Sequence, residues 1–210
     1  QEWFHGLSMG AINFEGDADK QAANDATAAD IDRELRPLME RMSSEPDGSA
    51  IASLLTHGCP AGHARSIESV MPSIKVILLG GMQEPGHAAA SCLVGLLTHP
   101  EQLAWVREDP DRWDDVVHEA LRWMPPIGTM QATALDDVPL GGAVIPRGAL
   151  VSAVVASACH DESLVADPTR FDVHRVRRPN GAFGYGPHFC AGHQFARDLA
   201  AYVVPQAAEP

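Results

Sequence analysis

Apolar residues in the first half of the chain recur at three- and four-residue steps, the spacing that places them on one face of an α-helix. A helix over residues 22–42 is predicted by four apolar residues at this spacing, namely Ile31, Leu35, Leu38 and Met42. Shorter helices are expected over residues 3–14 and 51–55, and the Pro-Asp-Gly run at 46–48 is a turn signal. The first part of the chain is therefore expected to be helical.

Residues 72–98 are apolar on nearly every side, which is typical of a helix buried at the centre of a domain. Two glycines, Gly80 and Gly81, weaken this helix, and Pro85 has no amide to donate to the carbonyl of Gly81. We therefore expect one long helix with a kink near Pro85. Two shorter helices should follow, over residues 101–109 and 111–123.

After two prolines at 125 and 126, short β-branched runs alternate with Gly-Gly and Pro-Arg-Gly turns, which predicts small hairpins over residues 135–157. Residues 161–181 have little periodicity and should be irregular. A final helix is expected to open near Ala191 and to close at Pro205. This order of elements predicts a mainly α-helical, α+β fold with small sheets, in one domain spanning residues 1–210.

Composition narrows the class of protein. The chain is 45% hydrophobic and 20% charged, as in ordinary globular proteins, and its net charge of −13 would repel the phosphates of nucleic acid. The most apolar window, residues 74–97, contains Lys75, Glu84 and Pro85, so we expect no membrane span. Four scattered cysteines without a C-x-x-C pair, and an N-terminus without signal-peptide features, favour a cytoplasmic location.

The segment FGYGPHFCAG places Cys190 between a glycine-rich loop and a predicted helix start. Free amides and the helix dipole at such a start stabilise a thiolate, and Gly184 and Gly186 permit a tight turn whose amides can point at the sulfur. A lone cysteine is more often a small buried apolar residue, but this surrounding pattern favours a charged sulfur. A surface metal site built from His188 and His193 is the alternative use of the segment.

This segment resembles the cysteine-ligand loop of the cytochrome P450 family, in which Phe, two residues with Gly, and a basic residue precede Cys-x-Gly. The resemblance implies that Cys190 is the axial thiolate of haem iron, that Phe183 packs near the sulfur and that His188 meets a haem propionate. Thiolate ligation of this kind favours O–O cleavage. The resemblance implies these haem contacts: Phe183, Gly184, His188, Cys190, Gly192 and, from the long helix, Gly81.

Glu119 and Arg122 are spaced so that they share one face of the helix predicted over residues 111–123. Most such pairs are exposed and stabilise a helix by about 0.2–0.5 kcal/mol. This pair also resembles the family's Glu-x-x-Arg helix, and the downstream segment ADPTRF resembles its Pro-x-x-Phe segment. The resemblance implies a buried structural triad of Glu119, Arg122 and Arg170, in which two cations compensate one carboxylate.

The segment GGMQEPGH resembles part of the family's oxygen-activating helix, where a small residue, a glycine, an acid and usually a threonine occur together. Glu84 takes the acid position, but Pro85 stands where the threonine is expected. Our hypothesis is that Glu84, with Gln83, supplies protons through water, while the kink frees the Gly81 carbonyl and opens space over the iron. A purely structural kink is the alternative.

The segment after the Glu-x-x-Arg helix resembles the one that lines the substrate pocket in the family. Its candidate contacts are Ile127, Gly128 and Thr129, joined from the long helix by Ile77 and Gly80. The implied substrate is a small apolar or aromatic molecule. The resemblance covers nearly the whole chain but corresponds to the C-terminal half of a family member, so a fold truncated on its N-terminal side is expected.

The resemblance implies a monooxygenase that inserts one oxygen atom from O2 into its substrate, with haem b as the cofactor. Electrons would come from NAD(P)H through a ferredoxin or a reductase. A basic cluster of Arg175, Arg177 and Arg178 is either a docking surface for an acidic redox partner or a solvated turn. The alternative function is a haem-binding but catalytically inactive fragment, or an interaction module.

Overall fold

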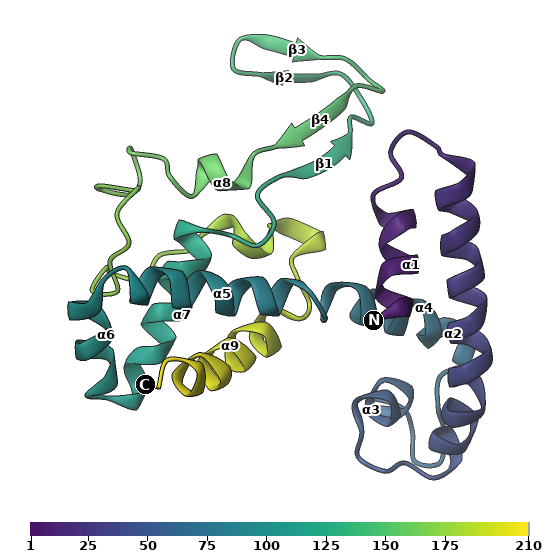
Figure 1. The fold of residues 1–210 in the computed structure, drawn as a ribbon. Coiled ribbons are helices and arrows are strands. Elements are labelled where there is room, and N and C mark those ends of the chain that lie inside the picture. The colour runs from purple at the N-terminus through teal and green to yellow at the C-terminus, as the bar shows by residue number, and fades with distance from the viewer. Residues whose placement is uncertain (210) are drawn as a thin grey trace. The chain divides into compact units, whose positions relative to one another are not determined.

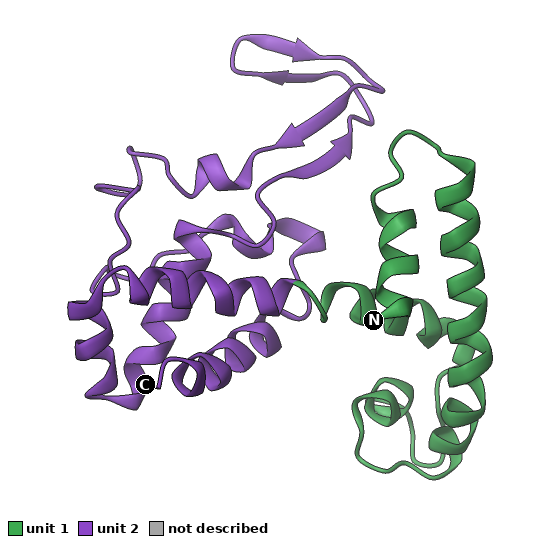
Figure 2. Cartoon of the chain, in the orientation of Figure 1, with its two compact units in different colours: residues 1–83 green, residues 84–210 purple. Residues whose placement is uncertain are grey.

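The computed structural model describes residues 1–209 and is rich in helices (Figure 1). It divides into two compact units, residues 1–83 and residues 84 onward (Figure 2). The single domain expected over residues 1–210 stays a prediction. Each unit is described by itself below.

The first unit is entirely helical. Its helices are α1 (Glu2–Ala11), α2 (Ala18–Ser44), α3 (Ala50–Thr56) and α4 (Ile67–Gly80). Side-chain caps fix three of the four starts, because Asp17, Ser49 and Ser66 each accept a hydrogen bond from an amide of the first turn of α2, α3 and α4. The Asp17 cap explains why α2 begins four residues before the predicted position.

The core of this unit lies among its four helices. Ile31 and Met42 of the predicted apolar face are buried, and Leu35 and Leu38 pack against the core. Gly6 and Gly10 allow α1 to lie close to α2. A Cβ at Gly6 would come within 1.8 Å of the Thr27 hydroxyl oxygen, and a Cβ at Gly10 within 2.4 Å of Asn24 Oδ1. The buried apolar residues are Leu7, Ile31, Met39, Met42, Ala52, Leu55, Val70, Met71 and Ile74.

The second unit combines helices with two small sheets. Its helices are α5 (Glu84–Leu97), α6 (Pro100–Arg107), α7 (Trp113–Trp123), α8 (Val155–Ala158) and α9 (His193–Ala207), with short 3-10 turns η1 (Pro110–Arg112), η2 (Gly181–Phe183) and η3 (Gly186–His188). Its strands are β1 (Met130–Thr133), β2 (Val138–Leu140), β3 (Ala143–Ile145) and β4 (Leu150–Ala153). Both sheets are antiparallel pairs, β1 with β4 and β2 with β3. The expected α+β class is therefore confirmed.

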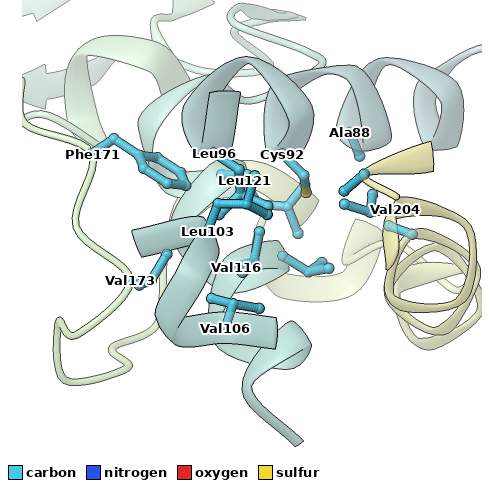
Figure 3. Close-up of a cluster of buried hydrophobic side chains, with 14 residues drawn as sticks. Ala88, Cys92, Leu96, Leu103, Val106, Val116, Leu121, Phe171, Val173 and Val204 are labelled. Atoms are coloured by element: carbon cyan, nitrogen blue, oxygen red, sulfur yellow. The ribbon is translucent and has the colours of Figure 1, made fainter. Parts of the chain in front are cut away.

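The core of the second unit forms where α5 packs against α7 and α9 (Figure 3). Phe171, from the irregular segment after α8, is completely buried in it. The buried Gln102 side chain holds this segment, since its Nε2 donates to the Phe171 carbonyl at 3.0 Å and its Oε1 accepts from the Val173 amide at 2.8 Å. The irregular segment is thus part of the core despite its lack of periodicity.

The prediction of one helix over residues 72–98 was wrong in its continuity. Helix α4 ends at Gly80 and α5 begins at Glu84, with a turn over residues 81–83 between them. Two adjacent glycines weaken the helix there, and Pro85 has no amide for the i−4 bond. At the second position of α5, Pro85 needs no such partner, because the first amides of a helix have none.

The last helix also differs from its predicted bounds. Helix α9 begins at His193, two residues later than expected, and it contains Pro205 and ends at Ala207. A proline in the last turn removes only one intrahelical bond, so the helix continues past it. None of the helices in residues 1–209 is both long and apolar enough to cross a membrane.

Candidate haem-thiolate site

Cys190 lies in the loop between η3 and α9, and its side chain is half-buried, whereas Cys92 and Cys159 are buried in the protein interior. Gly184 and Gly186 have φ angles of 73° and 70°, a region that residues with side chains rarely adopt. The Cys190 amide donates to the Phe183 carbonyl at 3.0 Å and closes the loop. The loop therefore presents the sulfur outside the apolar core.

The start of α9 lies beyond the cysteine. Gly192 is the N-cap, and a Cβ there would lie 3.9 Å from the Cys190 sulfur, so Gly192 lies directly beside that sulfur. His193 Nδ1 donates to the Cys190 carbonyl at 2.9 Å, and its ring stacks 4.8 Å from that of Phe189. His193 is thus engaged in holding the loop. Among the described residues, no three His, Cys, Asp or Glu side chains lie together in a way that could hold a metal ion.

Phe183 and Arg197 form a second support for the loop. The Arg197 guanidinium carbon lies 5.3 Å from the centre of the Phe183 ring, a cation–π distance. Arg197 Nε is buried and has no hydrogen-bond partner among residues 1–209. Arg197 was not among the residues predicted for the site. Its position one helical turn after His193 in the predicted last helix places it on the same helix face, which could have indicated its role.

Glu119 and Arg122 form a buried ion pair on α7, with 3% and 5% of their side-chain surfaces exposed. Arg122 Nε donates to Glu119 Oε2 at 2.8 Å and Arg122 Nη2 to Glu119 Oε1 at 2.7 Å, so the pair is bidentate. Arg122 Nη1 also donates to the Pro168 carbonyl at 2.7 Å. The pair therefore ties α7 to the irregular segment.

The third member of this clamp is Arg175, and the prediction of Arg170 was wrong. Arg175 Nε lies 3.4 Å from Glu119 Oε1, while Arg170 takes part through its backbone carbonyl, which accepts from Arg122 Nη2 at 3.2 Å. The segment turns between these two arginines, at Asp172, whose amide donates to Glu119 Oε1 at 3.0 Å. That turn points the later arginine inward and leaves Arg170 exposed.

The three arginines of the basic cluster all have contacts within the second unit. Arg175 belongs to the clamp, Arg177 Nε donates to Asp115 Oδ1 at 2.5 Å, and Arg178 Nη1 lies 3.4 Å from the Leu164 carbonyl. Arg177 and Arg178 are exposed. Docking of a redox partner on this cluster remains a prediction. Of the three arginines, only Arg177 and Arg178 are exposed enough to contact such a partner.

Glu84 is the first residue of α5, and its Oε2 is buried without a hydrogen-bond partner among residues 1–209. Gln83 lies in the preceding turn and is exposed. The amide of Gly81 donates to the Ile77 carbonyl at 2.8 Å, as the C-cap of α4. The helix break thus leaves a carboxylate oxygen at the start of α5 that no group in residues 1–209 satisfies.

The remaining predicted site residues fall into both units. Ile77, 55% exposed, and Gly80 belong to α4 in the first unit. Ile127, 45% exposed, Gly128 and Thr129 precede β1 in the second unit, where the Gly128 carbonyl accepts from the Ala156 amide at 3.0 Å. One group of pocket candidates therefore belongs to each unit. His188 is exposed in η3.

Comparisons with known proteins show which family the chain resembles. The family described as Cytochrome P450 matches residues 113–200, which include the clamp and the cysteine loop. The chain is 33% identical to the vitamin D(3) 25-hydroxylase of Pseudonocardia autotrophica over 183 residues, covering 85% of this chain and 45% of that protein. It is 32% identical to the 6-deoxyerythronolide B hydroxylase of Saccharopolyspora erythraea, covering 86% of this chain and 45% of that protein.

A solved structure extends the likeness to the fold. The ligand-free structure of cytochrome P450 TbtJ1 superposes on 98% of this chain with a TM-score of 0.84 and 27% identity, and the match covers 54% of that protein. The chain thus spans about half the length of the relatives that it matches. With the cysteine loop and the clamp inside the matched region, the chain belongs to the cytochrome P450 family and corresponds to part of a full-length member.

Proposed function

We propose that the chain is the haem-binding part of a monooxygenase, with Cys190 as the axial ligand of haem b. The observation that carries this proposal is the half-buried sulfur at the end of a loop shaped by two left-handed glycines and closed by the Phe183 carbonyl. The residues fit the cofactor, because Cys190 is the partly exposed cysteine of a glycine-shaped loop that carries a thiol, the group that ligates haem iron in such sites. When bound, the haem would supply the activation of O2 and the insertion of one oxygen atom into a small organic substrate.

The protein's own part in holding the cofactor would be divided among few side chains. Phe183 would cover the sulfur on the protein side, with its ring fixed by Arg197. His188, exposed in η3, would donate a hydrogen bond to a propionate. Gly184, Gly192 and Gly81 would let the backbone approach the flat ring closely, since a side chain at each would occupy that space.

We assign Glu84 to proton supply, with Gln83 beside it. The buried and unpartnered Oε2 supports this role, because buried polar atoms in proteins nearly always have a hydrogen-bond partner, and this one has none among the described residues. The test is Glu84→Gln, compared with the exposed Glu101→Gln, in a form of the protein that turns over. Glu84→Gln alone should lower the fraction of electrons that reach product, and an unchanged fraction would contradict the assignment.

The proposed substrate is a small apolar or aromatic molecule. Ile77 and Ile127 are exposed apolar side chains in the segments that the family resemblance assigns to the pocket, and Gly80, Gly128 and Thr129 belong to the same two segments. Two of the relatives named above are hydroxylases, which supports oxygen insertion as the reaction class. Electrons would come from NAD(P)H through a ferredoxin or a reductase, and the four free thiols fit a reducing, cytoplasmic location.

A haem titration of the purified chain tests the proposal. The wild-type chain should bind haem in a saturable way, whereas Cys190→Ala should lose the spectrum of thiolate ligation. Cys59→Ala is the matched control, because Cys59 is also a half-exposed free cysteine but lies outside the loop. Equal spectra for the wild type and Cys190→Ala would contradict the proposal.

A second candidate is a chain that binds haem but does not turn over. It is favoured by Pro85, which stands where the family usually has a threonine. Haem binding without product formation, in the presence of an electron donor and a range of apolar substrates, would support this candidate over the monooxygenase.

A further inference from the structure

A cavity of about 510 Å³ lies within the second unit, between α7 and the irregular segment that follows α8. Neither Cys190 nor Glu84 lines it, so it is separate from the proposed oxygen chemistry. The buried clamp of Glu119, Arg122 and Arg175 forms one part of its wall. Its volume is in the range of small-molecule sites, which is about 300–1,000 Å³.

The polar part of the cavity wall carries an excess of positive charge. Glu119 is its one carboxylate, and Arg122 and Arg175 already compensate that charge. Arg178 adds a further cation, whose nearest acceptor is the Leu164 carbonyl at 3.4 Å. In a protein with a net charge of −13, this is an unusual place for unpaired positive charge.

Asn180 adds a hydrogen-bond donor to the same wall. Its side-chain oxygen accepts from the Ala182 amide at 3.1 Å and caps η2. Its Nδ2 is buried and has no partner among the described residues. Because buried donors in proteins are nearly always satisfied, this amide points to an acceptor that residues 1–209 do not provide.

The rest of the cavity wall is largely apolar. Five aliphatic residues contribute to it, namely Ala158, Leu164, Val165, Ala166 and Val176. A bare inorganic anion would leave these side chains facing water, whereas a molecule with an apolar body would cover them. The wall therefore combines a site for one anionic group with a larger apolar surface.

We propose that this cavity binds a small amphipathic carboxylate, with its charged group at Arg178 and Asn180 Nδ2 and its apolar body against the aliphatic wall. Two charge-assisted hydrogen bonds would satisfy the donor that is otherwise unpaired. None of the residues proposed to contact haem lines the cavity, so binding is expected whether or not haem is present.

Calorimetric titration of the purified chain with phenylacetate tests the proposal. Phenylacetate should bind saturably, and both phenylacetamide, its neutral counterpart, and inorganic phosphate should bind at least about tenfold more weakly. Equal affinity for phenylacetamide would overturn the role of the charge. Equal affinity for phosphate would overturn the role of the apolar wall, and no saturable binding of phenylacetate would overturn the proposal as a whole.

Two variants and one control locate the site. Asn180→Asp keeps the acceptor that caps η2 but replaces the donor with a negative charge, and it should abolish phenylacetate binding. Arg178→Gln should weaken binding about tenfold, whereas Arg177→Gln, which removes the same charge from a residue paired with Asp115 outside the cavity, should change it less than about twofold. Equal effects of Arg178→Gln and Arg177→Gln would overturn the assignment. Circular dichroism of each variant checks that it is folded.

Discussion

Glu119 is a buried carboxylate, with 3% of its side chain exposed. A buried charge is stable only when oppositely charged or hydrogen-bonding groups compensate it. Arg122 binds Glu119 through two hydrogen bonds of 2.7 and 2.8 Å, and the Asp172 amide adds a third of 3.0 Å. Removing one charge of such a pair leaves the other buried and uncompensated. The clamp is therefore a structural device in which each member depends on the others.

Glu119→Gln should lower the free energy of unfolding by about 3–5 kcal/mol, because it leaves Arg122 buried without a counter-charge. Urea denaturation followed by circular dichroism measures this change. Arg175→Gln should cost about 1 kcal/mol, since Arg175 is partly exposed and its contact is longer. Arg170→Gln should change stability by less than about 0.5 kcal/mol. A larger loss for Arg170→Gln than for Arg175→Gln would contradict the observed clamp.

His118 gives the second unit a dependence on pH. Burial, and then the nearby charge of Arg197, lower the pKa of His118 from its ordinary value of 6.5. The folded protein thus binds this proton less readily than the unfolded chain does, so stability should fall as the pH drops below about 6.5. Relative to His118→Gln, the wild type should lose more stability between about pH 7 and pH 5. Parallel denaturation midpoints for the two proteins across this range would contradict the assignment.

At the scale of elements, α5 packs closely on the irregular segment because of one glycine. A Cβ at Gly95 would come within 2.5 Å of the Phe171 ring, which is completely buried and has no room to move. The glycine therefore sets the distance between helix and ring.

Gly95→Ala should destabilise the protein by about 1–3 kcal/mol, since the new methyl group overpacks this contact. Gly86→Ala is the matched control on the same helix, because a Cβ there meets nothing within 4 Å. That change should stabilise the protein by up to about 1 kcal/mol through helix propensity. Thermal denaturation compares the two, and shifts of the same sign would contradict the packing described here.

The local sequence was sufficient to predict some helix boundaries but not others. A disturbance of the helix near Pro85 was predictable, because two glycines and a proline remove helical stability at known positions. The complete break into two helices over residues 81–83 was not predicted, since a kinked but continuous helix was expected. Pro205 misled the prediction of the C-terminus because a proline in a last turn costs too little to end a helix.

At the scale of the whole molecule, the family and fold class were predictable because the cysteine loop and the Glu-x-x-Arg spacing are local patterns. The third member of the clamp was not, because four arginines lie between residues 170 and 178 and periodicity does not say which one turns inward. That choice is made by hydrogen bonds between the backbone of this segment and the side chains of Gln102 and Glu119, in which Glu119 accepts from the Asp172 amide. The cavity beside it depends on the same long-range contacts and left no signal in the sequence.

The most direct test of the account is the absorption spectrum of the reduced, carbon-monoxide-bound chain after reconstitution with haem. A thiolate ligand shifts the Soret band to a longer wavelength than a neutral ligand gives, so the shifted band should appear in the wild type and in Cys59→Ala. It should be absent in Cys190→Ala. A shifted band that survives Cys190→Ala, or a wild-type spectrum without one, would contradict ligation of the haem iron by the sulfur of Cys190.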